Sequence, residues 1–424
     1  MKLFINSKSI QNQPYLNTLF NKVLYCVITF LANALLTRAL GLSLKGEYAW
    51  ILNYANMIGV VSGLGIYQSA PFFIRNRPGK DWFQEYINIF TLQAFSYLIL
   101  AVVIGCLFHQ TPTVLFIGIL AVTDNFCQQL NMLLLINKIT ARNRIYTLGA
   151  IINLLLSIAV FLLVRSNLYA AIFATLIVKA FYIIAYLSLG GKLPHPLQTN
   201  WKMVWEKIHF GYLAMFSFLL IIMNYKIDVI MLKAYPMVSS EQLSLYTTGV
   251  SIAEIAWVIP DVFKDVLFSR TTDKRNDKEV VAALRISNAV IFIFIVGIIF
   301  LGRLFIKLFF GSVFLPAYLV TVLLFLGILP MSWFKIVYML FNAQGRRRTS
   351  FSVLLLSALL NIVLNAILIP SFGIYGAACA SIASYGLCGL LFLAIYAVVS
   401  KQKFFALFII NHNDLKTLFR RREA

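Results

Sequence analysis

Four lysines stand inside long apolar segments of this sequence, where a charged side chain is unusual: Lys22, Lys179, Lys226 and Lys335. An ammonium group near the centre of a lipid bilayer costs about 2.5–3.5 kcal/mol on membrane-insertion scales, so the four together oppose insertion by roughly ten kcal/mol. Charges of that cost usually face a water-filled cavity or an oppositely charged partner. The four lysines therefore predict a polar path through the apolar segments, suited to an anion.

The composition places the chain among polytopic membrane proteins. Of its 424 residues, 61% are hydrophobic and only 12% are charged, whereas a soluble domain carries about 25% charged residues. The net charge of +21 could suggest nucleic acid as a partner. The basic residues, however, lie mainly in short connectors between apolar stretches, as the positive-inside rule predicts, and no basic face lies outside that pattern. We therefore expect membrane lipids and no nucleic acid as partners.

Twelve segments are long and apolar enough to cross a bilayer. Each is far longer than a strand and lacks sustained alternation, so the expected fold class is an all-α integral membrane protein. Most of the 36 basic residues fall on the side that also holds both termini, which predicts cytoplasmic termini in a bacterial inner membrane. The expected spans are 16–39, 47–73, 84–108, 112–136, 145–165, 169–190, 209–233, 243–267, 284–309, 317–341, 350–370 and 374–399.

The chain is expected to divide into two six-helix bundles followed by a tail. Six is an even number, so both bundles would enter the membrane in the same direction and form parallel repeats about an axis along the membrane normal. The predicted divisions are an N-terminal lobe at 1–198, a C-terminal lobe at 199–400 and a basic cytoplasmic tail at 401–424. Residues 201–208 are interpreted either as an interfacial helix between the lobes or as the start of the seventh span.

A polar stripe runs along one face of the first span. Thr18, Lys22, Cys26, Thr29, Asn33 and Thr37 follow one another at spacings of three or four residues, which places them on one side of a helix. Two interpretations fit this stripe: it lines a cavity, or it makes hydrogen bonds to neighbouring helices. We favour the cavity, because the stripe crosses the whole span.

Acids also lie within the apolar spans, and the candidates for a role beside the lysines are Asp124, Asp228, Glu254 and Asp261. One interpretation is charge pairing without a ligand, between Lys179 and Asp124, Lys226 and Asp228, and Lys335 and Glu254. The other is functional: the lysines recruit an anion, and the acids exchange protons or tune the field. Partial pairing that a substrate displaces lies between the two and is the interpretation we favour.

Several other kinds of chemistry lack a signal in the sequence. There is no glycine-rich phosphate loop followed by lysine, which argues against a built-in ATPase. The four histidines are scattered, and the five cysteines all fall within apolar spans, so neither group has the spacing of a metal site or a disulfide framework. The predicted outer connectors are short, which argues against a membrane enzyme. We therefore expect a transporter with no cofactor and no metal, and not an enzyme.

Three stretches resemble motifs of a known transporter group. Thr37-Arg38-Ala39-Leu40-Gly41 with Gly46-Glu47-Tyr48 is similar to an R-x-L-G…G-x-Y pattern at the corner of the first two spans. Tyr225-Lys226-Ile227-Asp228, followed by Ile230-Met231-Leu232, resembles R-I-D-x-I-M-L, with lysine where arginine is common. The third runs from Asn342-Ala343-Gln344-Gly345-Arg346 through Asn361-Ile362-Val363-Leu364-Asn365 to Gly373-Ile374-Tyr375-Gly376. Together they resemble polysaccharide flippases of the multidrug/oligosaccharidyl-lipid/polysaccharide exporter (MOP) superfamily, and within it the O-antigen flippases of the Wzx type.

The resemblance implies a V-shaped, twelve-helix MATE-like transporter with a cavity between two six-helix lobes. It would move an undecaprenyl-diphosphate-linked oligosaccharide from the cytoplasmic to the periplasmic leaflet by alternating access, in a pathway with a polymerase and a chain-length regulator. The residues expected at the diphosphate and glycan are Lys22, Lys179, Lys226, Lys335, Arg38, Asn33 and Tyr182. Asp124, Asp228, Glu254 and Asp261 are the candidates for ion coupling or charge pairing. Flippases for capsule, teichuronic acid, enterobacterial common antigen or peptidoglycan precursor, and a multidrug cation antiporter, remain open as alternatives.

Overall fold

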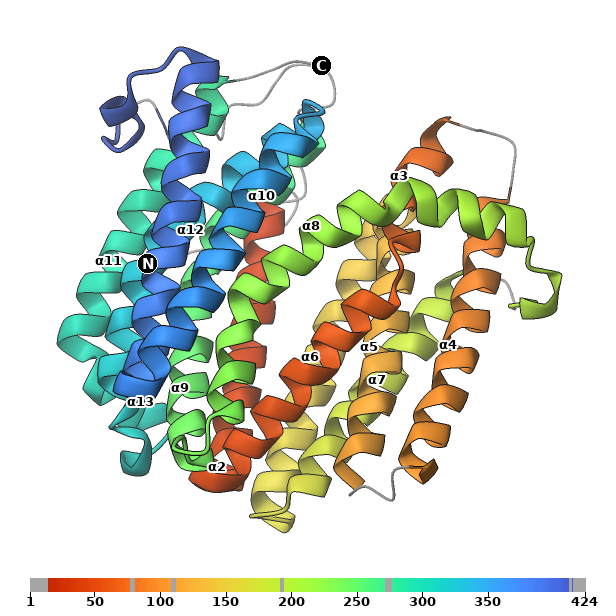
Figure 1. Ribbon diagram of the computed structural model, residues 1–424, viewed down its shortest axis with the longest axis horizontal. Helices are drawn as coiled ribbons and strands as arrows, with labels where there is room; N and C mark the ends of the chain where they lie inside the picture. The colour runs from red at the N-terminus through yellow and green to blue at the C-terminus, as the bar shows by residue number, and fades with distance from the viewer. Residues whose placement is uncertain are drawn as a thin grey trace, which may run out of the picture. The chain divides into compact units, whose positions relative to one another are not determined.

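The computed structural model describes residues 14–76, 81–107, 112–190, 194–270, 277–411 and Asp414. Over these residues every regular element is helical (Figure 1). The α-helices are α2 Pro14–Ser62, α3 Ile66–Asn76, α4 Trp82–Leu107, α5 Pro112–Asn137, α6 Ile139–Leu163, α7 Leu168–Gly190, α8 Trp201–Ala234, α9 Ser240–Ala253, α10 Val258–Arg270, α11 Asp277–Phe309, α12 Ala317–Ala343 and α13 Arg347–Ser400. The 3₁₀ segments are η1 Pro196–Gln198, η2 Glu254–Trp257, η3 Ser312–Phe314 and η4 Phe404–Leu407.

Ten candidate membrane spans are long and apolar enough to cross a bilayer within the described part of the chain. The two longest, in α2 and α13, are each two helices joined at a glycine. Gly41 has φ 71° and Gly373 has φ 55°, backbone conformations that glycine adopts without steric cost. The prediction of an all-α, multi-pass membrane protein is therefore confirmed.

The chain packs as two compact units, which we call the N-unit, residues 31–233, and the C-unit, residues 1–30 with 234–424. In the N-unit, one hydrophobic cluster joins α2, α5 and α7 around Ile51, Leu120 and Ile172. A second joins α3, α4, α5 and the start of α8 around Phe73 and Phe90. These packing units are not the predicted sequence repeats, and the division into lobes 1–198 and 199–400 stays a prediction.

In the C-unit, α12 packs against α9, α10, α11 and α13 and is the most buried of the ten candidate spans. The chain beyond α13 packs against this unit, since Arg285 of α11 pairs with Asp414 at 3.2 Å. Within the unit, Trp333 of α12 donates to Asn288 of α11 at 2.6 Å. Residues 1–13 and half of the predicted tail at 401–424 lie outside the described residues.

Residues 201–208 form the first turns of α8, and the helix continues without a break to Ala234. The segment is therefore the start of the seventh predicted span and not a separate interfacial helix. Trp201 and Trp205 are exposed, whereas Lys207 is buried. Its ammonium group pairs with Glu85 and lies 4.8 Å from the ring centre of Tyr86. Glu85 and the ring of Tyr86, both in α4, therefore compensate the buried charge of Lys207 and join the start of α8 to α4.

Two backbones meet where α8 crosses the start of α3 in the N-unit (Figure 1). A Cβ added to Gly211 would lie 1.9 Å from the carbonyl oxygen of Gly65. Gly65 itself has φ 75° and closes the turn between α2 and α3. Glycine at both positions is what permits this approach, because any side chain would push the helices apart.

The substitution Gly211→Ala is expected to destabilise the protein by about 1–3 kcal/mol, the usual cost of overpacking a closed contact. Thermal unfolding in detergent, followed by tryptophan fluorescence, measures the effect. Gly297→Ala in α11 is the matched control, since a Cβ there meets nothing within 4 Å and alanine favours the helix. Equal midpoints for the two variants would contradict the interpretation of the Gly65–Gly211 contact.

Candidate functional site

One carboxylate in the C-unit gathers lysines from three helices. Asp261 of α10 lies 3.1 Å from the ammonium group of Lys335 in α12 and 3.0 Å from that of Lys264 in α10. Lys22 of α2 donates to the backbone carbonyl of Asp261 at 2.8 Å. Lys335 also lies 4.2 Å from the ring centre of Trp257. We call these five residues the Asp261 cluster.

The backbone around Asp261 explains how these groups meet. The candidate span at 240–264 is not one regular helix: α9 ends at Ala253, η2 follows, and α10 begins at Val258. A 3₁₀ turn inside a span frees backbone groups from the helical pattern and often marks a functional site. Helix α12 packs against both η2 and α10, which brings Lys335 to the joint.

The Asp261 cluster joins three lysines to one aspartate. The carboxylate of Asp261 pairs with Lys264 and Lys335, Lys22 reaches its backbone carbonyl, and Glu254 of η2 also interacts electrostatically with Lys335. Lys335 is 8% exposed, whereas the side chains of Asp261 and Lys264 are 27% and 29% exposed. Several ammonium groups gathered at one place are an arrangement that attracts a small anion.

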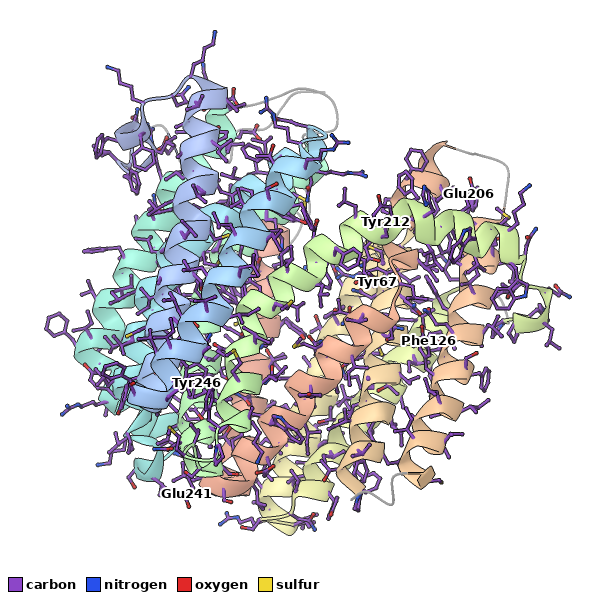
Figure 2. The ribbon with its side chains drawn as sticks, in the orientation of Figure 1. Tyr67, Phe126, Glu206, Tyr212, Glu241 and Tyr246 are labelled. Atoms are coloured by element: carbon purple, nitrogen blue, oxygen red, sulfur yellow. The ribbon has the colours of Figure 1, made fainter. Side chains whose placement is uncertain are left out.

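A second set of polar side chains lies in the N-unit, along one face of α5. Asp124 pairs with Lys179 of α7, which is one of the three pairs in the charge-pairing interpretation. One turn further along, the hydroxyl of Tyr67, a residue labelled in Figure 2, donates to Gln128 at 3.5 Å. Asn131 accepts from Arg142 of α6 at 2.6 Å. We call this row the α5 polar face.

The other predicted site residues have varied surroundings. Asn33 accepts from the buried Lys45 at 2.8 Å, Tyr182 stacks on Tyr186 with ring centres 5.8 Å apart, and Arg38 is exposed. Asp228 is buried on α8 and accepts from the backbone of Val229 at 2.8 Å. Lys226 is half-buried on α8 and Glu254 begins η2.

The structure thus brings together some of the predicted residues and adds others. Lys22, Lys335 and Asp261 meet in the C-unit, whereas Lys179 and Lys226 belong to the N-unit. Asp261 contacts Lys335, a partner that the sequence analysis did not assign to it. Sequence reasoning placed Lys45 and Arg142 in connectors, because each lies near the end of an apolar stretch. Lys264 falls within the predicted span 243–267, and its spacing of three residues from Asp261 already indicates that the two side chains lie one helical turn apart.

The family model of the lipid II flippase MurJ matches residues 262–417. No curated protein matches the chain. Among solved structures, the chain is similar to "Lipid II flippase MurJ, inward closed conformation", with 17% identity, a TM-score of 0.69, and coverage of 94% of this chain and 91% of that one.

Two further similar structures are transporters of the same superfamily. An inward-facing multidrug resistance MATE family transporter has 14% identity and a TM-score of 0.65, and the match covers 89% of this chain and 95% of that one. A MOP superfamily transporter from Pyrococcus furiosus, described as having a binding pocket of reverse polarity, has 12% identity and a TM-score of 0.58, over 96% and 99% of the two chains. The fold is similar to that of these MurJ and MATE transporters. At these identities the likeness establishes the fold and leaves the substrate to be argued from the residues.

Removing the carboxylate of the Asp261 cluster is expected to destabilise the protein. Asp261→Asn leaves the charges of Lys264 and Lys335 without their shared acid, and breaking a fully buried pair costs about 3–5 kcal/mol. Because Asp261 is partly exposed, we expect about 1–3 kcal/mol, measured as thermal unfolding in detergent.

The double variant Asp261→Asn/Lys335→Met tests the cause. Methionine removes the buried charge and keeps a similar volume, so the double variant is expected to regain at least half of the lost stability. Glu241→Gln, which neutralises an exposed acid in the first turn of α9, is the control for loss of a negative charge. A further loss of stability on adding Lys335→Met would show that the aspartate does not act through this lysine.

Proposed function

We propose that this protein is a flippase for a lipid-linked oligosaccharide, and that the lysines of the Asp261 cluster bind the diphosphate that joins lipid to glycan. The observation that carries this proposal is the gathering of three ammonium groups at Asp261 inside a MOP-type membrane fold, two at its carboxylate and one at its backbone carbonyl. A glycan diphosphate cannot cross hydrocarbon unaided, because its polar groups lose their hydration. Lysine ammonium groups replace part of that hydration.

The chemistry of lysine suits a transporter that must also release its substrate. Lysine binds phosphate as a compact point charge on a flexible stem, whereas arginine forms a planar, bidentate clamp. Asp261 occupies the lysines when no substrate is bound, and an arriving diphosphate competes for them. The partial pairing seen at Asp261 and at Asp124 fits the hypothesis of pairs that a substrate displaces.

The finer assignment is an undecaprenyl-diphosphate-linked O-antigen repeat unit, moved from the cytoplasmic to the periplasmic leaflet by alternating access. It rests on the three sequence motifs. The alternative of a peptidoglycan precursor is favoured by the match of residues 262–417 to the lipid II flippase model. Both substrates present the same diphosphate to the protein, so the Asp261 cluster serves either. In either case the protein would be no enzyme, and for O-antigen it would work beside a polymerase and a chain-length regulator.

A multidrug cation antiporter is the second class to consider, because MATE family transporters share the fold. The lysine excess in the Asp261 cluster argues against it, since an organic cation would be repelled. Asp124, Asp228 and Glu254 remain candidates for ion coupling in the proposed flippase.

The proposed topology is twelve crossings in two six-helix bundles, with both termini in the cytoplasm of a bacterial cell. It counts α2 and α13 as two crossings each, divided at Gly41 and Gly373. The remaining eight crossings are α4, α5, α6, α7, α8, α9 with α10, α11 and α12.

Complementation tests the function. The protein is expressed in one strain that lacks its O-antigen flippase and in another depleted of its lipid II flippase, and surface O-antigen or growth is measured. Rescue of either strain supports the flippase, and the strain that is rescued names the glycan. Failure in both strains, together with resistance to cationic drugs, would overturn the proposal.

The double variant Lys22→Met/Lys335→Met is expected to lower transport at least about tenfold at equal membrane abundance, since each charge-assisted hydrogen bond to phosphate contributes about 1.5–3 kcal/mol. Lys202→Met, which removes an exposed lysine at the start of α8, is the matched control and is expected to keep full transport. Full transport by the double variant would exclude the Asp261 cluster as the diphosphate site.

A further inference from the structure

Arg142, near the start of α6, is held by amides instead of acids. Its Nε donates to Asn131 of α5 at 2.6 Å, and one terminal nitrogen donates to Asn143 at 3.0 Å. The guanidinium carbon lies 4.8 Å from the ring centre of Tyr146, one turn further along α6. The group is thus fixed on three sides by neutral partners.

This arrangement differs from that of four other buried or half-buried cations in the described part of the chain, although the buried Lys45 also has a neutral partner, Asn33. Lys179, Lys207 and Arg285 each pair with a carboxylate, as does Lys335. Arg142 is half-buried, and within the described residues none of its interactions is with an acid. Arginine stays protonated in proteins, so its charge cannot be lost by deprotonation. A partly desolvated charge without a counterion is stabilised when an anion binds.

The geometry leaves donors for such an anion. A guanidinium group has five N–H donors in a planar fork. Two of them are used by Asn131 and Asn143, and Tyr146 also hydrogen-bonds to the group, which leaves two donors for a ligand. Tyr146 holds the plane of the group from one face, and Asn131, Asn143 and Tyr146 are themselves only half-buried. A fixed fork with free donors is the arrangement that recognises phosphate.

The position along the helices indicates where the anion comes from. Helix α5 ends at Asn137 and α6 begins at Ile139, so Arg142 lies close to the joined ends of two helices that are candidate membrane spans. The ends of a membrane-spanning helix lie near the polar headgroup regions of a bilayer. The neighbouring Arg144 is exposed and adds positive charge to the same end of α6.

We infer that Arg142, with Asn131 and Asn143, forms a phosphate-binding site at the membrane surface of the N-unit, separate from the Asp261 cluster. The inference rests on the proposed function in one respect: the ligand we expect is the diphosphate of the lipid-linked substrate before it is translocated. The headgroup phosphate of an anionic membrane lipid has the same chemistry and is the second source.

Three variants separate this site from general charge effects. Arg142→Met removes the fork, and Asn143→Asp supplies an internal carboxylate that occupies Arg142 without removing it. Arg144→Met is the matched control, because it removes an exposed arginine two residues away on the same helix. Thermal unfolding in detergent checks that each variant is folded. If Arg142→Met does not fold, Asn143→Asp still tests the site.

Binding is measured by native mass spectrometry of the full-length protein in detergent, with two probes in separate titrations: undecaprenyl diphosphate and phosphatidylglycerol. Arg142→Met and Asn143→Asp are expected to weaken binding of undecaprenyl diphosphate about tenfold, the usual effect of losing a hydrogen bond between charged groups. Arg144→Met is expected to change it less than about twofold.

The outcomes distinguish two claims: that Arg142 forms a phosphate-binding site, and that the protein is a flippase for a lipid-linked substrate. An equal loss of phosphatidylglycerol binding in both variants supports the site and assigns it to membrane lipid. If the wild-type protein binds phosphatidylglycerol through Arg142 but does not bind undecaprenyl diphosphate, the site stands and the proposed function fails. If Lys335→Met weakens undecaprenyl diphosphate binding while Arg142→Met and Asn143→Asp change neither probe, the proposed function stands and this inference is wrong.

Discussion

The pairing of a lysine with a carboxylate in apolar surroundings is the interaction on which the rest of the structure depends. A single uncompensated charge in hydrocarbon costs more than most packing contacts return. The helices must therefore be arranged so that each deep ammonium group reaches an acid, a carbonyl or an aromatic ring. Asp261 meets this requirement for α10 and α12, and Asp124 does so for α5 and α7.

Irregular backbone also occurs close to the Asp261 cluster. The 3₁₀ turn η2 lies just before α10, in which the carbonyl of Asp261 accepts from Lys22. Elsewhere in the C-unit some polar side chains satisfy one another, as Asn361 and Ser384 of α13 do at 2.8 Å. Irregular backbone and charge thus coincide at one place, which is the arrangement that membrane transporters use for polar substrates.

Sequence reasoning predicted the helical membrane fold and the deep charges, because apolar length and charge are local properties of the chain. It also predicted the pair of Lys179 and Asp124. It did not assign Asp261 to Lys335, since that contact depends on how α10 packs against α12. Arg142 was read as a connector residue, because its distinguishing property is the absence of an acidic neighbour among the described residues, and only the fold reveals which side chains surround it.

During synthesis of the chain, Lys179 and Lys22 meet their partners at different times. Lys179 follows its partner Asp124 by 55 residues, so the acid precedes the lysine into the membrane. Lys22 precedes the carbonyl of Asp261 by 239 residues, which at typical translation rates is a delay of roughly 10–50 s. During that time the ammonium group of the first span has no Asp261 to contact. The first helix must therefore wait near the membrane surface, or with its lysine reaching toward water, until the second half of the chain arrives.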